Sequence, residues 1–312
     1  MSMTRVSTHR KGRTGLAAGA LALTAAVCLV AVATNAVAAA PTDRLPDLQM
    51  LKPSSLRMEN SGGQRRLRMS TTIVNTGKGP FETRASRRST SASTMGVSQR
   101  VYNTAGGTRV NETSQVAKYA GDGHNHWHVQ NIAHYDLYSG TGKGAILRRD
   151  SKVGFCFFDT NAYRLSLPGA PGGRRYVQSG CGTKSSLFVK NGLSVGWSDV
   201  YPWNIGLQWI NVTGLPAGVY LLKLTANPTG EFEESSMRNN CNWTRIRIPK
   251  TGSSVAVLGS GSSCILPGSE PAPTPIPTGR VVIPPRPAVD TSMVGPPGPA
   301  DQALAFVCQV AT

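Results

Sequence analysis

The sequence predicts an all-β chain: a single β-sandwich-like domain with long loops, followed by a Pro-rich C-terminal tail. After residue 38, no long stretch repeats apolar residues at i, i+3, i+4 and i+7, the spacing of an amphipathic helix. Short runs of β-branched and aromatic residues, broken by Gly, Pro, Asn and Ser, recur instead and are typical of strands. Between Pro267 and Pro299 lie 11 prolines, a composition that favours an extended tail over a packed core.

The first 38 residues have the pattern of an export signal. Basic residues precede an apolar run at 16–32, and Ala36-Val37-Ala38 fits the small-residue pattern that signal peptidase cleaves. A membrane anchor is the alternative, because the run is nearly long enough to span a bilayer. No charged cluster follows the run to stop its transfer. We therefore expect residues 1–38 to be removed, leaving a secreted protein without a membrane segment.

The predicted domain covers residues 41–264 and the predicted tail covers 265–312. Within the domain, strands are expected where β-branched and aromatic residues gather, namely at 67–74, 134–138, 152–158, 207–212 and 220–226. Asn, Gly and Pro predict a turn at 75–80. Residues 82–95 are rich in Arg, Ser and Thr, which predicts an exposed loop.

The positive charge of the chain indicates which classes of partner it could bind. After removal of residues 1–38, which hold four of the 33 Lys and Arg, 29 basic residues face 16 acidic ones, a net charge of +13. For an exported chain without an Arg-rich helix, this predicts no nucleic-acid partner and favours an anionic cell-wall polymer. A solvated basic surface is the alternative.

The cysteines predict disulfides, because thiols outside the cell are largely oxidised. The pairs Cys156 with Cys181 and Cys241 with Cys264 close the shortest loops. Cys308 is then left over.

The histidines are concentrated in one segment. Apart from His9 in the signal, the chain holds only His124, His126, His128 and His134. On a strand, alternate residues point to one face, so the first three imidazoles would converge on a single ion. Imidazole binds copper, zinc, iron and nickel, so the triplet predicts a transition-metal site without choosing the metal. Zinc hydrolases and cupins also use histidine-rich strands.

Several short motifs occur in the order found in one family. They are H-N-H-W-H at 124–128, A-H-Y-D-L at 133–137, K-V-G-F-C at 152–156, D-V-Y at 199–201, L-Q-W-I-N-V-T at 207–213, P-A-G-V-Y at 216–220 and an N-P-x-x-x-x-x-E-S stretch at 227–235 that precedes Asn239 and Asn240. Together they make the stretch from His124 to Cys241 resemble the catalytic domain of the lysyl oxidases, and the copper and quinone region is expected at 119–250.

The resemblance implies copper on His124, His126 and His128, and a lysine tyrosylquinone built from Lys152 and Tyr201. Such a protein oxidises primary amines, including peptidyl lysine, with dioxygen and releases an aldehyde, hydrogen peroxide and ammonia. Lysine can supply the nucleophile for the cross-link only when it is unprotonated.

The catalytic base has two candidates. His134 is not needed for the triplet and titrates near the working pH, so it is preferred. Asp199 lies two residues before Tyr201 and shares its face if the segment is extended.

The resemblance also implies a calcium site. Asp47, Glu234, Asn239 and Asn240 match the family's ligands, and carboxylate and amide oxygens suit a hard cation. Ser236 stands where animal members have an acidic ligand, and a turn stabilised by the asparagine side chains is the alternative.

Two rivals to an amine oxidase remain open at this point. One is a non-catalytic extracellular copper-binding or wall-associated module that never forms the quinone. The other is a zinc hydrolase, which is disfavoured because no carboxylate near the triplet offers an obvious base.

Overall fold

The computed structural model describes residues 40–120, 124–150 and 154–269. Contacts divide the chain into two units, Met1–Thr42 and Asp43–Thr312, and the strands lie in the second. The described part holds strands and one 3-10 turn, η1 (Gln178–Cys181), without an α-helix. The all-β prediction is therefore confirmed. None of these residues belongs to a helix that could span a bilayer.

The predicted signal and the predicted Pro-rich tail flank the described residues. The signal at 1–38 lies outside the described residues, and so does the tail beyond Ser269. The domain boundaries stay a prediction.

The strands form three antiparallel sheets. The first has the order β11 (Gly154–Phe155), β8 (Trp127–Gln130), β7 (Thr108–Tyr119), β6 (Thr94–Asn103), β5 (Phe81–Ser86) and β13 (Phe188–Leu193), with β1 (Asp43–Arg44) beside β6. The second is β10 (Arg148–Arg149), β9 (Ala133–Ser139), β16 (Gly218–Ala226), β17 (Cys241–Ile248) and β18 (Ala256–Gly261). The third is β12 (Asn161–Ala162), β14 (Trp197–Tyr201), β4 (Gln64–Asn75) and β15 (Trp209–Asn211), with β2 (Leu48–Met50) and β3 (Ser54–Ser61) on β4.

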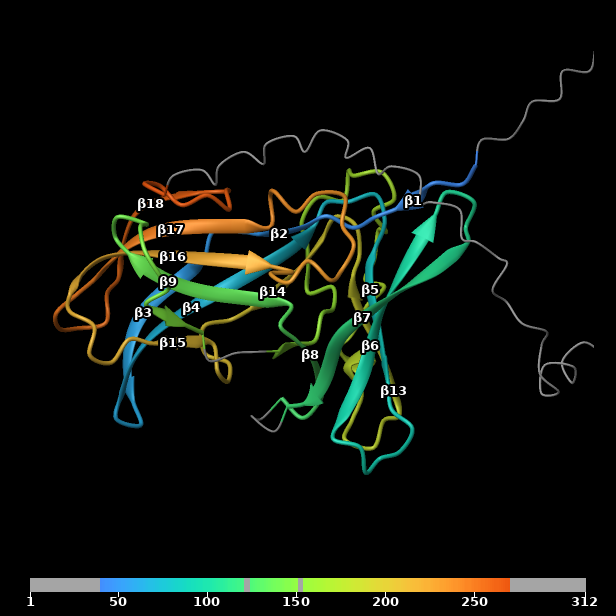
Figure 1. Ribbon diagram of the computed structural model, residues 1–312, viewed down its shortest axis with the longest axis horizontal. Coiled ribbons are helices and arrows are strands. Elements are labelled where there is room, and N and C mark those ends of the chain that lie inside the picture. The colour runs from blue at the N-terminus through green and yellow to red at the C-terminus, as the bar shows by residue number, and fades with distance from the viewer. Residues whose placement is uncertain (1–39, 121–123, 151–153, 270–312) are drawn as a thin grey trace, which may run out of the picture. The chain divides into compact units, whose positions relative to one another are not determined.

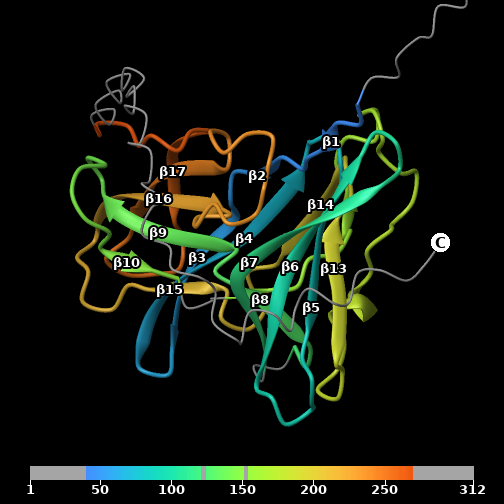
Figure 2. The ribbon, with the colours of Figure 1, turned by 45° about the vertical axis from the view of Figure 1, so that its right-hand side comes forward.

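The second and third sheets pack against each other, because β2 contacts both β16 and β17 (Figure 1). Figure 2 shows β5, β6 and β7 of the first sheet beside this pair. One cluster of buried side chains joins all three sheets and includes Leu67 of β4, Phe81 of β5 and Leu224 of β16. Alternate residues of β4 are buried from Leu67 to Ile73, as a strand with one core face requires. Burial of this shared face holds the sheets together.

The strands predicted at 67–74, 134–138 and 220–226 are confirmed as parts of β4, β9 and β16. The expected turn at 75–80 is also present, since the chain bends there between β4 and β5.

The prediction of an exposed loop at 82–95 is wrong at both ends of this range. β5 fills the first part of that range, and β6 begins before its end. Polar residues could be buried here because they are hydrogen-bonded: Glu82 accepts bonds from the hydroxyls of Tyr102 at 2.8 Å and Tyr176 at 2.9 Å. Only residues 87–93 connect the two strands.

The strand predicted at 152–158 is much shorter than expected. Residues 151–153 lie outside the described part, and β11 ends at Phe155. The chain then leaves the sheet, because Cys156 bonds to Cys181 and the carbonyl of Phe157 accepts a hydrogen bond from Gly192 N. The strand predicted at 207–212 likewise shortens to β15.

Both predicted disulfides are confirmed. Cys156 pairs with Cys181 across 5.8 Å between their Cα atoms, and Cys241 pairs with Cys264 across 4.8 Å. Cys308 lies outside the described residues. Disulfides of this kind persist in oxidising compartments, which suits an extracellular protein.

Candidate metal centre

The three histidines of the triplet come together in space. One ring nitrogen from each of His124, His126 and His128 lies within 4.8 Å of the others. Their ring centroids are 4.7–5.6 Å apart. Among the described residues, no carboxylate belongs to the cluster. The donor set is therefore three imidazoles around one point, with room for further ligands.

A turn, and not a regular strand, makes these histidines converge. Only His128 lies on β8, whereas His124 lies in a turn and His126 in a bend. Asn125 between them has a left-handed backbone with φ of 53°, a conformation that asparagine tolerates better than most residues. The expectation of three residues on one strand face is therefore wrong for two of them. The turn gathers rings that a strand would hold roughly 6–7 Å apart.

Trp127 fixes the register of this segment. Its side chain is 1% exposed, and its indole Nε1 donates a hydrogen bond to the carbonyl of Thr183 at 2.8 Å. The guanidinium of Arg87 lies 4.5 Å from the ring centroid, and Tyr119 packs edge-on against it. Because successive side chains of a strand point to opposite faces, anchoring Trp127 in the core turns His128 the other way.

The triplet opens into a cavity of about 180 Å³. The same cavity is lined by two of the predicted catalytic residues, Asp199 and Tyr201. The remaining lining residues are Cys156, Phe158, Gln178, Val200, Pro202 and Ile205. The structure thus brings the triplet, Asp199 and Tyr201 to one place.

Tyr201 is held firmly in the lining of this cavity. Its hydroxyl lies 2.6 Å from Asp199 Oδ2 and 2.9 Å from the carbonyl of Cys156, and both are acceptors for its proton. The ring packs edge-on against Phe155 and Phe157. Burial, reinforced by the neighbouring Asp199, raises the pKa of Tyr201 well above its ordinary value. The phenol is therefore neutral and oriented toward the carboxyl group.

Asp199 is the buried titratable group of the cavity. It is 1% exposed, and burial raises the pKa of its carboxyl well above the ordinary value. Its Oδ2 accepts bonds from Tyr201 and, at 3.4 Å, from Phe158 N. Its Oδ1 has no hydrogen-bond partner among the described residues. A buried carboxyl with a raised pKa and one oxygen without a partner has the features of a group that transfers protons in a functional site.

His134 lies elsewhere. It sits on β9 opposite Thr225 of β16 and does not line the histidine cavity. The adjacent Tyr135 is buried in the core against Phe155, so His134 points away from it on the other face of the strand. Burial, followed by the charge of Arg149, lowers the pKa of His134. Of the two candidate bases, the structure brings Asp199 to the cavity and leaves His134 outside it.

Lys152, the expected quinone partner, lies outside the described residues. Gln178 lines the cavity although sequence reasoning did not single it out. It belongs to η1, which the disulfide from Cys156 to Cys181 ties beside the cavity. The predicted disulfide was the one sequence signal that could have pointed to this segment.

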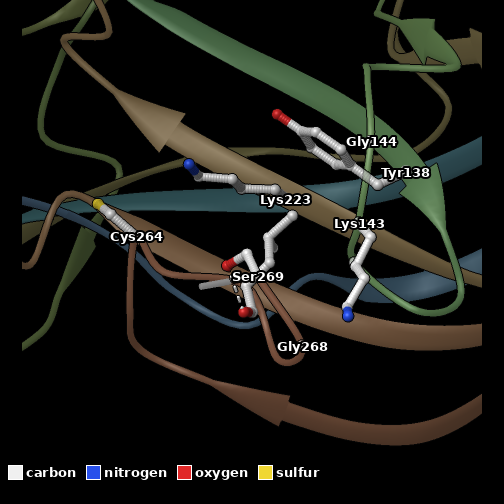
Figure 3. A pocket seen from close by; sticks show the side chains of 9 residues that line it. Tyr138, Lys143, Gly144, Lys223, Cys264, Gly268 and Ser269 are labelled. Carbon is white, nitrogen blue, oxygen red and sulfur yellow. Dashed lines mark hydrogen bonds between the residues drawn. The ribbon is translucent and has the colours of Figure 1, made fainter. Parts of the chain in front are cut away.

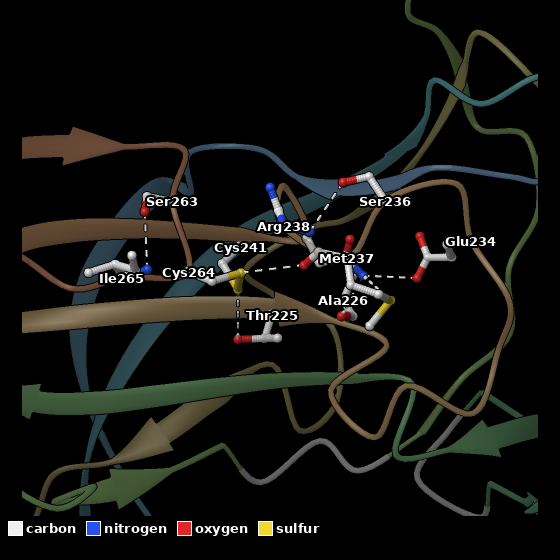
Figure 4. The surroundings of a disulfide bond; sticks show 11 residues. Thr225, Ala226, Glu234, Ser236, Met237, Arg238, Cys241, Ser263, Cys264 and Ile265 are labelled. Atoms are coloured by element: carbon white, nitrogen blue, oxygen red, sulfur yellow. Dashed lines mark hydrogen bonds between the residues drawn. A yellow bond between two sulfur atoms is a disulfide. The ribbon is translucent and has the colours of Figure 1, made fainter. Parts of the chain in front are cut away.

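The four residues assigned to calcium also meet in the fold. Asn239 Nδ2 donates to both carboxylate oxygens of Asp47, at 2.9 and 3.0 Å. Asn240 Nδ2 donates to Glu234 Oε1 at 2.8 Å, and Leu48 N donates to Glu234 Oε2 at 2.6 Å. The Oδ1 atoms of both asparagines are buried and have no partner among the described residues. Figure 4 shows Glu234 on the same loop as Met237, beside the disulfide of Cys241 and Cys264.

The fold and this cavity define a disulfide-linked all-β protein with a candidate transition-metal centre. The lysyl oxidase family model matches residues 89–258, more than half of the chain. The chain therefore belongs to the lysyl oxidase family.

Curated relatives agree with this assignment. Lysyl oxidase homolog 4 of Mus musculus is 32% identical over 120 residues, which is 38% of this chain and 14% of the relative. Lysyl oxidase homolog 3B of Danio rerio is 33% identical over 123 residues, 38% of this chain and 13% of the relative. Lysyl oxidase homolog 3 of Homo sapiens is 32% identical over 123 residues, 38% of this chain and 14% of the relative. The match thus spans a small part of each relative's length.

Proposed function

We propose that the protein is a secreted copper- and quinone-dependent oxidase that converts primary amines to aldehydes. The observation that carries this proposal is the joint lining of one cavity by His124, His126, His128, Asp199 and Tyr201. Membership of the lysyl oxidase family supports it. Each turnover would consume amine, dioxygen and water and release aldehyde, ammonia and hydrogen peroxide.

The histidines fit a copper ion. Three imidazole nitrogens within 4.8 Å of one another are a donor set that copper accepts. When bound, copper and the Lys152–Tyr201 quinone supply the redox chemistry, with dioxygen as oxidant and a quinone carbonyl as the electrophile for the amine.

The chain's own groups prepare that chemistry. Tyr201 is fixed in one orientation by its two acceptors and by the edge-on rings of Phe155 and Phe157. Asp199 is our candidate for the base that removes the α-proton of the amine, and its unused Oδ1 supports this role.

The cavity favours slim substrates. Its volume of about 180 Å³ and its wall of Phe158, Val200, Pro202 and Ile205 suit an unbranched alkyl chain that ends in an amine. Lysine side chains of proteins and simple alkyl amines meet this description.

Anaerobic titration of the copper-loaded protein with phenylhydrazine tests the proposal, because the reagent counts reactive carbonyl groups. We expect one equivalent bound per chain and a parallel loss of peroxide release from n-butylamine. A copper-loaded protein that takes up no reagent would be the non-catalytic copper module. A protein that retains zinc and rejects copper in metal analysis would be the hydrolase.

Asp199→Asn tests the base. The variant keeps the shape of the side chain but cannot accept the α-proton, so we expect kcat to fall by roughly 100- to 10,000-fold with copper retained. The deuterium isotope effect for an α-deuterated amine should rise as proton removal becomes slower. His134→Gln is the matched control, since His134 lies outside the cavity. If His134→Gln loses activity and Asp199→Asn keeps it, the assignment of the base is wrong.

Calcium at Asp47, Glu234, Asn239 and Asn240 remains part of the proposal. The support is that two carboxyl groups and two asparagines meet here and that the buried Oδ1 atoms of both asparagines have no partner among the described residues. The cation would tie the segment before β2 to the loop before β17 and so stabilise the fold.

Thermal unfolding with and without calcium tests this site. Burial raises the pKa of Glu234 to about 7, so this carboxyl keeps its proton at pH 6 and loses it at pH 8. Without calcium, the contribution of Glu234 to the free energy of unfolding therefore falls as the pH rises from the ordinary pKa of a glutamate to the pKa of about 7 in the folded protein. We expect calcium to raise Tm at pH 8 and much less at pH 6, and Glu234→Gln to remove the response.

Glu112→Gln is the control for that experiment, because Glu112 is an exposed acid on β7. If calcium does not change the Tm of the wild type at pH 8, the turn stabilised by asparagine side chains is the correct interpretation.

A further inference from the structure

A second cavity lies on the outer side of the second sheet, away from the histidines. Its volume is about 430 Å³, within the range of roughly 300–1,000 Å³ common for small-molecule sites. Tyr138 of β9 and Lys223 of β16 line it from the sheet, and Lys143 from the loop after β9 (Figure 3). Leu266 and Ser269 line it from the segment after β18. It shares no lining residue with the histidine cavity.

The walls of this cavity are fixed by close backbone contacts. Gly142 has φ of 74°, and a Cβ at that position would lie 2.3 Å from the carbonyl oxygen of Pro267. Gly268 has φ of 84°, and its Cβ would lie 2.4 Å from the carbonyl oxygen of Thr141. Two glycines thus allow the loop after β9 and the segment after β18 to touch. The disulfide to Cys264, another lining residue, anchors the second segment.

The lining is cationic and unbalanced. Lys143 and Lys223 contribute two positive charges, and none of the carboxylates in the described part of the chain lines the cavity. The nearest acid of β9, Asp136, is already engaged by Arg149 at 2.6 and 3.2 Å. Within the described part of the chain, neither lysine forms an ion pair.

Lys223 emerges from the middle of a sheet, between β9 and β17. Burial lowers the pKa of its amine, and Asp136 offsets only part of this effect. A half-buried ammonium is less stable than a solvated one, and Asp136 also pairs with Arg149, so an anion in the cavity would stabilise Lys223 further. Tyr138 is partly buried beside it, and burial raises the pKa of its hydroxyl, which therefore stays a neutral donor.

We propose that this cavity binds an anionic ligand that carries several phosphate or carboxylate groups. Two lysines from different walls suit more than one negative group, and the size of the cavity exceeds the need of a single small ion. The ligand chemistry has two sources, a free oligophosphate and a segment of an anionic polymer such as one of the cell wall. The net positive charge of the chain would raise the local concentration of either.

Isothermal titration calorimetry with sodium tripolyphosphate at physiological salt tests the site on the full chain. We expect saturable binding with one ligand per chain. Lys223→Gln and Lys143→Gln should each weaken the affinity roughly tenfold, since each removes a charge-assisted contact. Lys223→Arg should retain most of it. Lys190→Gln, which removes the same charge from the exposed edge strand β13, should leave the affinity unchanged.

The outcomes separate a built site from general attraction between charges. Equal, small losses in the variants at positions 143, 190 and 223 would overturn the proposal, and so would the absence of saturable binding by the wild type. Long-chain polyphosphate then distinguishes the two sources of ligand. Tighter binding of the polymer through the same two lysines supports a polymer segment, and equal affinity supports the free oligophosphate.

Discussion

Amine-dependent peroxide release should disappear completely in Lys152→Ala and in Tyr201→Phe, while copper still binds at the wild-type stoichiometry. Neither residue belongs to the triplet, yet each would supply one half of the quinone. The phenylalanine ring keeps the packing of Tyr201 against Phe155 but lacks the hydroxyl from which oxidation starts. We expect a tryptic digest of the copper-loaded wild type to yield one branched peptide that joins the segments around residues 152 and 201. Both variants should yield linear peptides only.

Tyr163→Phe is the matched control, because Tyr163 is 39% exposed and lies outside the cavity. If wild-type protein incubated with copper and oxygen contains only unmodified Tyr201, the quinone hypothesis is contradicted. The non-catalytic copper-binding module would then be the better interpretation. A cross-link without turnover would direct attention to Asp199 and to the choice of amine.

The sequence predicts the fold well where burial follows a simple period. The alternation from Leu67 to Ile73 places that stretch on a strand, and the structure extends the strand only slightly at each end. The two disulfides follow from loop length alone. The prediction from composition failed at residues 82–95, because hydrogen bonds from distant tyrosines allow Glu82 to be buried. A local sequence pattern contains no information about partners so far away in the chain.

Sequence reasoning singled out the triplet, Asp199 and Tyr201, which the structure brings to one cavity, but it anticipated neither their geometry nor Gln178. Asp199 and Tyr201 are two residues apart, and an extended segment was enough to put both in the lining of one cavity. The convergence of His124 and His126 depends on a left-handed Asn125, which no strand period anticipates. His134 carries a suitable ring, but its place opposite Thr225 follows from sheet register, which is set by tertiary packing.

His126→Ala should abolish stoichiometric copper binding. His126 is in the middle of the triplet, with its ring centroid 4.7 Å from that of His128 and 5.6 Å from that of His124. Its loss leaves two imidazoles, which cannot complete a three-nitrogen site. Copper content after dialysis and the electron paramagnetic resonance signal should both fall to background, and peroxide release should fall with them. His134→Gln, which removes the other histidine after residue 38, should bind copper as the wild type does.

Folding can be separated from metal binding in this experiment. His126 is partly exposed and lies in a bend, whereas the neighbouring Trp127 carries the core contacts, so the metal-free variant should unfold at nearly the wild-type Tm. A variant with unchanged Tm and no copper assigns the metal to the triplet. One equivalent of copper held by His126→Ala with wild-type affinity would place the site elsewhere, and the roles proposed for Tyr201 and Asp199 would fail with it, since both depend on copper in this cavity.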